Sequence, residues 1–386
     1  MRSFLPFFLL PLRLVAEVLA LYLSWYDDPT TTMTIQWHTL TKEKATRCRL
    51  YLPDGKKIDH EADFLSLEDR LIYRITLKEL LPDTDYRFQI DDDPALYLFR
   101  TAPLVLEKPL KFLVGGDLYQ SKEIFRKITP SLIDQDPLFA VLGGDIAYAI
   151  HPDPFTDFTG FFQTPAKRWF NFLRDWKERM IAPDGRIIPF LLLPGNHDIS
   201  SKAPDLFFKL FDFPEKKLYR EISFGNYLSL LLLDTGHLSP IKGEQTLFLQ
   251  NSLKQNRDKP YLIPVYHIAA YPSYYAFQAE TPKTLRKWWC PLFDEANLPI
   301  AFENHNHSWK KTFPIRGEKI DPSGTIYLGD GCWGAIPRTT RKDWYLDKAG
   351  AFNHVYLVEL EAEKATIQAL TFSAESLDRF TIQPRH

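Results

Sequence analysis

Seven apolar runs, each ending in small or polar residues, place the strongest constraint on how the chain beyond residue 109 can fold. They occupy residues 111–117, 138–145, 187–198, 227–237, 261–267, 298–307 and 324–331. Continuous apolar runs of this length are typical of strands buried on both faces of a sheet. Helix-like stretches at 164–180 and 243–256 separate several of them. This alternation of strands and helices predicts an α/β domain.

The polar residues that end these runs have a common chemistry. In such sheets, functional sites lie just beyond the carboxyl ends of the strands. The sequence places carboxylates, an amide and imidazoles there: Asp117, Asp145, Asn196, His197, Asp198, His267, His305 and His307. These groups are ligands for one or two first-row metal ions, and the lack of thiolates among them excludes a cysteine-rich structural zinc site. Glycines before Asp117 and Asp145 allow sharp turns and close approach of a substrate.

The region before these runs shows the alternation of half-buried strands. In TMTIQWH, Met33, Ile35 and Trp37 share one face of a strand. Short alternating segments separated by polar turns predict an all-β sandwich. The turn LPDTDY at residues 81–86 resembles the Leu-Pro-x-Thr-x-Tyr turn of fibronectin type III domains, in which the tyrosine forms a corner.

The chain therefore divides into three parts. We expect an N-terminal extension over residues 1–20, a fibronectin III-like all-β domain over residues 21–103, and an α/β domain over residues 109–386. A length of 386 residues suits two domains rather than one core.

Taken in order, the strand-end motifs resemble the calcineurin-like metallophosphoesterases. The motifs are GGD (115–117), GGDIAY (143–148), PGNHD (194–198), VYH (265–267) and NHNH (304–307). Tyr148, three residues after Asp145, narrows the resemblance to the purple acid phosphatases. The preceding DPTTTMTIQWHT is similar to the N-terminal domain of that family, so the resemblance covers nearly the whole chain beyond residue 20. It implies a four-layer α/β metallophosphoesterase fold, a β-sandwich core flanked by helices, preceded by a smaller all-β sandwich domain.

The resemblance also implies a binuclear metal centre bridged by Asp145. The first ion, Fe³⁺ in the family, would take Asp117, Asp145, Tyr148 and His307. The second ion, Fe²⁺, Zn²⁺ or Mn²⁺, would take Asp145, Asn196, His267 and His305. A tyrosinate bound to Fe³⁺ gives the purple colour of the family. The implied reaction is attack of a metal-bound hydroxide on a phosphate ester, with His197 as proton donor beside the leaving oxygen and Asp198 orienting His197.

The sequence departs from the family pattern in three places. Asn304 stands where the family has glycine, and asparagine is the least costly substitute at a positive φ. The motif at 265–267 is one residue shorter than Val-x-x-His. The following stretch lacks the histidine pair that contacts phosphate in many members, and Tyr271, Tyr274 or Tyr275 could take its place. These departures leave the acid-phosphatase substrate preference open.

Several other polar residues have competing interpretations. Asp234 and His237 end an apolar run without matching a family motif, which favours a structural role. His151, in the loop after the GGDIAY motif, could bind substrate or be structural. Glu303 is expected to be a solvated loop residue, and Asp330 is a candidate to support the metal ligands. His38 and His354 lie in strand-like patterns and are expected to be structural.

Charge and cysteine content exclude several classes of protein. With 47 Lys and Arg against 49 Asp and Glu, the chain has no basic footprint of a nucleic-acid-binding protein. Cys48, Cys290 and Cys332 are odd in number and widely spaced, which excludes a disulfide framework and favours buried free thiols. No segment after the N-terminus approaches the ~18 consecutive apolar residues of a membrane span.

The N-terminal residues resemble a signal peptide. Arg2 precedes an apolar run at 4–12, and a small-residue site ends at Ala20, although Arg13 and Glu17 interrupt the stretch. This pattern favours a secreted or periplasmic protein. A cytoplasmic protein with an ordinary N-terminal extension is the alternative. The sequence does not indicate an oligomeric state.

The function expected from the sequence is acid-phosphatase-like hydrolysis of a small phosphorylated substrate. A phosphodiesterase or nucleotidase on the same scaffold is the alternative within enzymes. A binding protein that combines an adhesive sandwich with a degenerate site is the alternative from another class. The complete set of potential ligands disfavours the binding protein.

Overall fold

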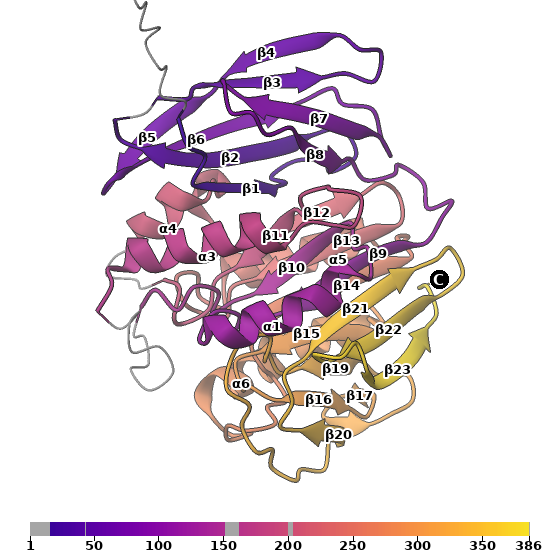
Figure 1. Cartoon of the computed structure of the whole chain (residues 1–386). Coiled ribbons are helices and arrows are strands. Elements are labelled where there is room, and N and C mark those ends of the chain that lie inside the picture. Colours follow the sequence, from indigo (N-terminus) through magenta and orange to yellow (C-terminus); the bar gives the residue numbers. More distant parts are fainter. Residues whose placement is uncertain (1–15, 43, 151–161, 200–203, 386) are drawn as a thin grey trace, which may run out of the picture.

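A computed structural model describes residues 16–42, 44–150, 162–199 and 204–385, which form a smaller all-β domain and a larger α/β domain (Figure 1). The predicted fold class is confirmed. Cys48, Cys290 and Cys332 are free and buried, as expected. Among the described residues, no helix has both the length and the apolar character needed to cross a bilayer.

The N-terminal domain consists of two four-stranded antiparallel sheets, with the orders β1-β2-β6-β5 and β4-β3-β7-β8. The strands are β1 (Ala20–Ser24), β2 (Met33–Leu40), β3 (Arg47–Tyr51), β4 (Lys57–Glu61), β5 (Asp63–Leu67), β6 (Arg70–Leu77), β7 (Asp85–Ile90) and β8 (Tyr97–Arg100). In the core of this domain, Trp37 of β2 and Tyr73 of the neighbouring strand β6 stack their rings with the centroids 5.2 Å apart. At the predicted turn, the Tyr86 hydroxyl accepts a hydrogen bond from the Leu81 N–H at 2.8 Å.

Strand β2 has an apolar and a polar face, and both are buried. On the polar face, Gln36 donates to the carbonyl of Leu210 at 2.7 Å, and the ring of His38 packs edge-on against Phe170 at 5.5 Å. Both partners belong to the α/β domain. The polar face of β2 is therefore a contact between the two domains, which confirms that His38 is structural.

The predicted N-terminal extension contributes its last residues to this first sheet. Residues 1–15 lie outside the described residues. Leu19 donates its N–H to the His38 carbonyl at 2.8 Å, Ala20 pairs with His38 in β1, and Lys177 donates to the Val18 carbonyl. The small-residue site at Ala20 is thus inside the folded sheet, and the all-β domain starts before residue 21.

The α/β domain is built around two mixed sheets. One has the order β11-β10-β9-β21-β22-β23 and the other β12-β13-β14-β15-β19-β16-β20, and β17 and β18 form a separate hairpin. The strands are β9 (Leu110–Gly115), β10 (Phe139–Gly143), β11 (Phe190–Leu193), β12 (Arg220–Phe224), β13 (Leu228–Leu233), β14 (Tyr261–Ile268), β15 (Ile300–Asn304), β16 (Trp309–Thr312), β17 (Ile315–Arg316), β18 (Lys319–Ile320), β19 (Ile326–Gly329), β20 (Leu346–Gly350), β21 (Val355–Leu360), β22 (Ala365–Leu370) and β23 (Ser376–Ile382). Each of the seven predicted apolar runs contains one of these strands to within one residue.

Helices cover the outer faces of the two sheets, which gives four layers (Figure 1). The helices are α1 (Lys122–Ile133), α3 (Pro165–Arg179), α4 (Asp205–Leu210), η1 (Pro214–Lys216), α5 (Glu244–Gln255), α6 (Glu280–Trp288) and α7 (Cys290–Glu295). Helices α3 and α5 confirm the two helical stretches expected from the sequence. Thr164 caps α3 by accepting from the Lys167 N–H, and Pro165 occupies its first turn.

The parallel strands bring the predicted site residues to one edge of the sandwich. Strands β9, β10 and β11 run parallel in one sheet, and β13, β14, β15 and β19 run parallel in the other. Their carboxyl ends lead into loops that meet between the sheets. This topology explains why residues as distant in sequence as Asp117 and His307 come into contact.

We predict that the domain contact at His38 weakens in acid. Tyr22 donates its hydroxyl to the Leu210 carbonyl, so His38 Nε2 donates to the Tyr22 oxygen, and His38 Nδ1 has no hydrogen-bond partner within the described part of the chain. Burial, with a smaller contribution from Arg70, lowers the His38 pKa from 6.5 to about 3. Just below pH 6.5, the His38 imidazole is therefore protonated in the unfolded chain but not in the folded one. Its contribution to the free energy of unfolding is complete above pH 6.5 and is lost progressively as the pH falls toward 3.

The expected loss of unfolding free energy from His38 is about 2 kcal/mol between pH 8 and pH 5. Urea unfolding at a series of pH values measures it, and His38→Gln should flatten the curve over this range. His354, whose pKa burial lowers to about 4, should account for part of the remaining dependence. Identical pH curves for the wild type and His38→Gln would contradict the prediction.

Candidate metal centre

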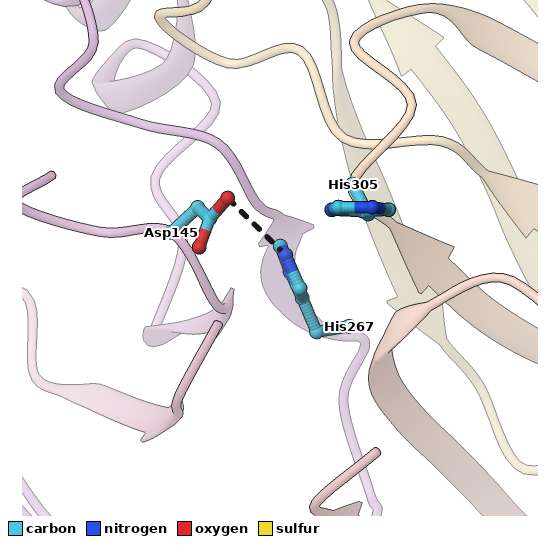
Figure 2. Close-up of side chains that lie close together, drawn as sticks. All are labelled: Asp145, His267 and His305. Atoms are coloured by element: carbon cyan, nitrogen blue, oxygen red, sulfur yellow. Dashed lines mark ion pairs between the residues drawn. The ribbon is translucent and has the colours of Figure 1, made fainter. Parts of the chain in front are cut away.

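Two clusters of side chains in the α/β domain have donor atoms close enough to hold a metal ion, and they share one residue. Asp145, His267 and His305 form one cluster, which Figure 2 shows with the Asp145–His267 ion pair. Asp117, Asp145 and His307 form the other. Within each cluster, the donor atoms all lie within 4.8 Å of one another. Asp145 is therefore positioned between two potential ions.

The backbone of this region is held in conformations that side chains rarely adopt. Asp117 and Asp145, just beyond β9 and β10, have φ of 57° and 51°. Gly144 has φ +89°, and a Cβ at this position would lie 2.6 Å from His267 Nδ1. Glycine is therefore required before Asp145, and it makes room for one of the imidazoles of the site rather than for a substrate. Left-handed backbone that clusters in this way is typical of functional sites.

Asp145 has one carboxylate oxygen fixed and one free. Oδ1 accepts from the His197 backbone N–H at 2.7 Å. Oδ2 lies 3.3 Å from His267 Nε2, is buried and makes no aligned hydrogen bond among the described residues. Burial alone would raise the pKa of Asp145, but the imidazoles of His267, His197 and His305 lower it below its usual range. The group is thus a carboxylate with a free oxygen directed into the cluster.

His267 is oriented by a backbone carbonyl. Its Nδ1 lies 2.9 Å from the Gly143 carbonyl oxygen, and its Nε2 lies 3.3 Å from both Asp145 Oδ2 and Asn196 Oδ1. A carbonyl on one ring nitrogen leaves the other available as a ligand. Burial would lower the pKa of His267, but Asp145 raises it to about 9. The pairing of β14 with β15 shifts register between Val265 and Ile268, at the shortened motif that contains His267.

Tyr148 lies in the second cluster. Its hydroxyl is 3.3 Å from Asp117 Oδ1 and 3.0 Å from His307 Nε2, and His307 Nε2 is 3.0 Å from Asp117 Oδ1. The phenol is buried, and burial together with Asp117 raises its pKa well above 10. Its ring stacks on His197 with the centroids 4.8 Å apart. Tyr148 therefore connects the cluster of Asp117 and His307 to the predicted proton donor, His197.

The turn with the two histidines has both of them in the left-handed region. His305 and His307 have φ of 79° and 56°, and the His305 N–H donates to Asp117 Oδ2 at 2.9 Å. His305 Nδ1 is buried without a hydrogen-bond partner among the described residues. Burial and the neighbouring His267 lower the pKa of His305 well below 6.5, so its ring is neutral. A neutral imidazole with an unpartnered nitrogen can bind a cation.

Asn304 has a different role from the one expected for this position. It ends strand β15 in extended backbone rather than at positive φ. Its side chain donates to the Tyr266 carbonyl at 2.9 Å and fills the space above two glycines. A Cβ on Gly116 or Gly143 would lie 2.6 Å or 2.1 Å from the Asn304 amide. The expectation of a left-handed asparagine is wrong: the residue packs between the loops that carry the aspartates.

Glu303 is buried, so the expectation of a solvated loop residue is also wrong. It pairs with the buried Lys310, whose Nζ also lies 2.9 Å from Asp330 Oδ1. Burial raises the pKa of Asp330 to about 6 although Lys310 opposes this shift. The Asp330 carbonyl accepts from the N–H groups of Asn306 and His307. Asp330 thus links this ion cluster to the histidine turn. A supporting role was expected from the sequence for Asp330, but not for Glu303 or Lys310.

Asp198 and His197 are adjacent in sequence but do not form the expected pair. Asp198 accepts hydrogen bonds from the backbone N–H groups of Gly195, Ile146 and Ala147. His197 Nδ1 lies 2.9 Å from the carbonyl of Ile150. The prediction that Asp198 orients His197 is therefore wrong, because Asp198 ties together the loops after β10 and β11. Burial and the Asp145 carboxylate raise the pKa of Asp198 to about 7.

The predicted substrate contacts have different fates. Tyr271 is buried in the core of the second sheet, where its ring packs 4.6 Å from Tyr327, so the prediction that it binds substrate is wrong. Tyr274 is exposed by 38% beside the site. His151 lies outside the described residues. His237 has its Nδ1 2.9 Å from Asp234 Oδ1 and its ring 5.7 Å from that of His267.

The remaining alternative concerned Asp234, and its contacts favour the structural interpretation. Its carboxylate accepts from the N–H groups of three residues in the following turn: His237, Leu238 and Ser239. These contacts close the loop after β13.

Sequence reasoning missed two residues near the site. Asn306 stands between the paired histidines, and its side-chain oxygen accepts from the N–H groups of Tyr274 and Tyr275 at 3.1 and 2.9 Å. Lys310 lies in a strand and is fully buried among acidic groups. An asparagine in a polar turn and a lysine in a strand carry no local signal of these contacts.

Comparison with known protein families gives two matches. Residues 18–101 match the purple acid phosphatase N-terminal domain, and residues 110–313 match the calcineurin-like phosphoesterase family. Purple acid phosphatase 21 of Arabidopsis thaliana is 24% identical over 278 residues, covering 67% of this chain and 58% of that protein. Purple acid phosphatase 18 of the same plant is 22% identical over 325 residues, covering 79% and 68%. The chain thus spans about three fifths to two thirds of these relatives.

Solved structures show the same fold. A purple acid phosphatase, PPD1, from yellow lupin (Lupinus luteus) seeds aligns with a TM-score of 0.75 at 14% identity, covering 94% of this chain and 74% of that chain. The structure of PhoD aligns with a TM-score of 0.71 at 12% identity, covering 95% and 88%. At such identities, the similarity concerns the fold alone.

We predict that Asp145→Asn removes bound metal from both clusters, because a neutral amide cannot supply a shared carboxylate. Metal analysis after loading and desalting measures the loss. The matched control is Asp175→Asn, which changes a buried carboxylate that pairs with Arg126 and Tyr119 away from the clusters. Full metal content in Asp145→Asn, or equal losses in both variants, would contradict the shared role of Asp145.

Proposed function

This chain belongs to the calcineurin-like phosphoesterase family, and on that basis we propose that it hydrolyses phosphate monoesters with two metal ions. The observation that carries the proposal is that two clusters of potential ligands share the Asp145 carboxylate. Mutually close carboxylates and imidazoles that are this deeply buried are costly to fold unless cations neutralise them. Binding of two adjacent cations would explain why these groups are buried so close together.

The residues present fit such a centre. Asp145 Oδ2 and His305 Nδ1 are buried atoms without hydrogen-bond partners among the described residues, and both belong to the cluster in Figure 2. We propose that Asp117, Asp145, Tyr148 and His307 hold one ion and that Asp145, Asn196, His267 and His305 hold the other. When bound, two such cations lower the pKa of water and polarise a phosphoryl oxygen.

His197 is the residue that we propose for proton transfer to the leaving oxygen. Its Nδ1 is held by the Ile150 carbonyl, its ring stacks on Tyr148, and its backbone N–H is bonded to Asp145. These contacts fix the imidazole beside the shared carboxylate, and His197 belongs to neither cluster. A fixed imidazole at the edge of the centre can donate a proton to an alkoxide as it departs.

The identities of the ions are a finer proposal. The buried Tyr148 phenol has a raised pKa next to Asp117, so it ionises only beside a strongly charged cation. A hard trivalent ion prefers the anionic oxygens of two carboxylates and a phenolate. We therefore propose Fe³⁺ at the cluster of Tyr148 and Fe²⁺, Zn²⁺ or Mn²⁺ at the cluster of His267 and Asn196.

The proposal also includes the type of the N-terminal domain, export of the protein and the class of substrate. The Tyr86–Leu81 hydrogen bond supports a fibronectin III-like corner in the N-terminal domain. Export to the periplasm or the exterior rests on Arg2 and the apolar run that follows it. Because Val18 and Leu19 contact the folded domain, processing of an exported form would take place before residue 18. A small phosphorylated molecule is the proposed substrate, with phosphodiesters as the alternative.

Hydrolysis of 4-nitrophenyl phosphate by metal-loaded protein tests the proposal, with bis(4-nitrophenyl) phosphate as the diester comparison. Faster release from the monoester is expected. Preference for the diester would favour a phosphodiesterase. Absence of turnover and of bound metal would favour the non-catalytic binding protein.

His197→Asn is expected to lower kcat by about 10²- to 10⁴-fold, because it removes the proposed proton donor. Metal content should stay close to that of the wild type, since the side chain of His197 is in neither cluster. His60→Asn, in strand β4 of the N-terminal domain, is the control and should leave both quantities unchanged. Loss of metal from His197→Asn would mean that its imidazole is a ligand.

Tyr148→Phe tests the identity of the first ion through the visible spectrum. If a tyrosinate binds Fe³⁺, iron-loaded oxidised wild-type protein absorbs in the visible range, and the phenylalanine variant is bleached. Phenylalanine keeps the stacking on His197 and removes only the hydroxyl. A colourless, fully active wild-type protein would exclude the Fe³⁺–tyrosinate assignment and leave the phosphoesterase proposal intact.

A further inference from the structure

Arg338 places a fixed positive charge beside the candidate metal centre. Its backbone N–H donates to the carbonyl of His307 at 2.7 Å, which ties the loop after β19 to the histidine turn. Its Nη1 donates to the Tyr275 hydroxyl at 2.9 Å. The guanidinium carbon lies 5.1 Å from the ring centroid of Tyr274 and 5.5 Å from that of Tyr275. Two aromatic contacts and a hydrogen bond therefore hold the guanidinium in place.

The two tyrosines are themselves fixed by the metal-binding turn. The ring of Tyr275 stacks on His305, with the centroids 4.9 Å apart and the planes inclined by 24°. The side-chain oxygen of Asn306 accepts from the N–H groups of Tyr274 and Tyr275. Tyr275 thus contacts both a proposed metal ligand and Arg338. One side chain, Tyr275, therefore separates the guanidinium from the cluster of His267 and His305.

Arg338 forms no ion pair with a carboxylate among the residues that the structure describes. Many other arginines of the chain do form such pairs, for example Arg49 with Asp59 and Arg100 with Asp85. A guanidinium stays charged at any working pH and offers a fork of donors that matches a carboxylate or phosphate. Because one fork position is used by Tyr275, the others remain available at the half-buried edge of the site.

We propose that Arg338 binds a second anionic group on the leaving group of the substrate. The preferred substrates would then be phosphate monoesters whose leaving group is itself anionic, such as a phosphorylated hydroxy acid. Tyr275 lies between Arg338 and His305, so the guanidinium is set back from the proposed metal ligand by one side chain. This inference rests on the proposed phosphatase function and adds a substrate class to it.

The test compares two monoesters that differ in the charge of the leaving group. Glycerol 3-phosphate has a neutral leaving group, glycerol, whereas 3-phosphoglycerate leaves the glycerate anion. For Arg338→Ala, we expect the ratio of kcat/KM for 3-phosphoglycerate to kcat/KM for glycerol 3-phosphate to fall about 10- to 100-fold. Arg338→Lys keeps the charge without the fork and should give an intermediate ratio.

A second measurement does not depend on turnover. Calorimetric titration of the metal-loaded protein with methylenediphosphonate, whose P–C–P bridge cannot be hydrolysed, and with inorganic phosphate should show that Arg338→Ala weakens diphosphonate binding more than phosphate binding. Arg341→Ala is the matched control, since it removes an exposed arginine of the same loop. It should change neither the kcat/KM ratio of the two substrates nor the ratio of the two binding affinities. Tyr275→Phe, which frees the guanidinium from its hydrogen bond, should reduce the substrate ratio by a smaller factor.

The possible failures are distinguishable. If the wild type hydrolyses glycerol 3-phosphate but Arg338→Ala leaves the substrate ratio unchanged, the inference is overturned and the proposed function stands. If both substrates lose activity in parallel, Arg338 holds the site together or contacts the reacting phosphoryl group, and the inference is again overturned. If metal-loaded wild-type protein hydrolyses neither substrate, the proposed function fails and the inference fails with it.

Discussion

The shared carboxylate of Asp145 is the interaction on which the rest of the site depends. One of its oxygens is fixed by a backbone N–H, and the other points into the space between two clusters of imidazoles and acids. Concentrating such groups away from water is expensive unless opposite charges compensate them. The imidazoles already lower the pKa of Asp145, and His267 is raised to about 9 in return. Cations bound on each side of the carboxylate would complete this compensation.

The surrounding structure acts to keep these groups in place. Asp198 binds the backbone of the loops after β10 and β11, Asn304 fills the space against the glycines at the ends of β9 and β10, and the Lys310 cluster supports the histidine turn. Each of these contacts is polar and buried, so a partial loss would leave unpaired groups in the interior. They hold left-handed backbone at five of the proposed ligands: Asp117, Asp145, Tyr148, His305 and His307. The strain is thus distributed over a network rather than carried by one loop.

The fold and the clustering of the candidate ligands were predictable because both leave periodic or ordered signals in the sequence. Apolar runs that end in polar residues specify buried strands, and parallel topology brings those ends together. Contacts that arise only in three dimensions were not predictable. Glu303 and Lys310 are charged residues near strand ends, and nothing local distinguishes a buried pair from two solvated groups. Tyr271 and Tyr274 are three residues apart in the loop after β14, yet Tyr271 packs in the core against Tyr327 and Tyr274 is exposed, because the loop passes from the core to the surface between them.

The most direct test of the account is anomalous diffraction from crystals of metal-loaded protein. We predict two anomalous peaks about 3.5–4 Å apart, one on each side of the Asp145 carboxylate. One peak should lie beside Asp117 and His307, and the other beside His267 and His305. A single peak, or peaks that both lie away from Asp145, would contradict the central claim that this carboxylate is shared between two ions.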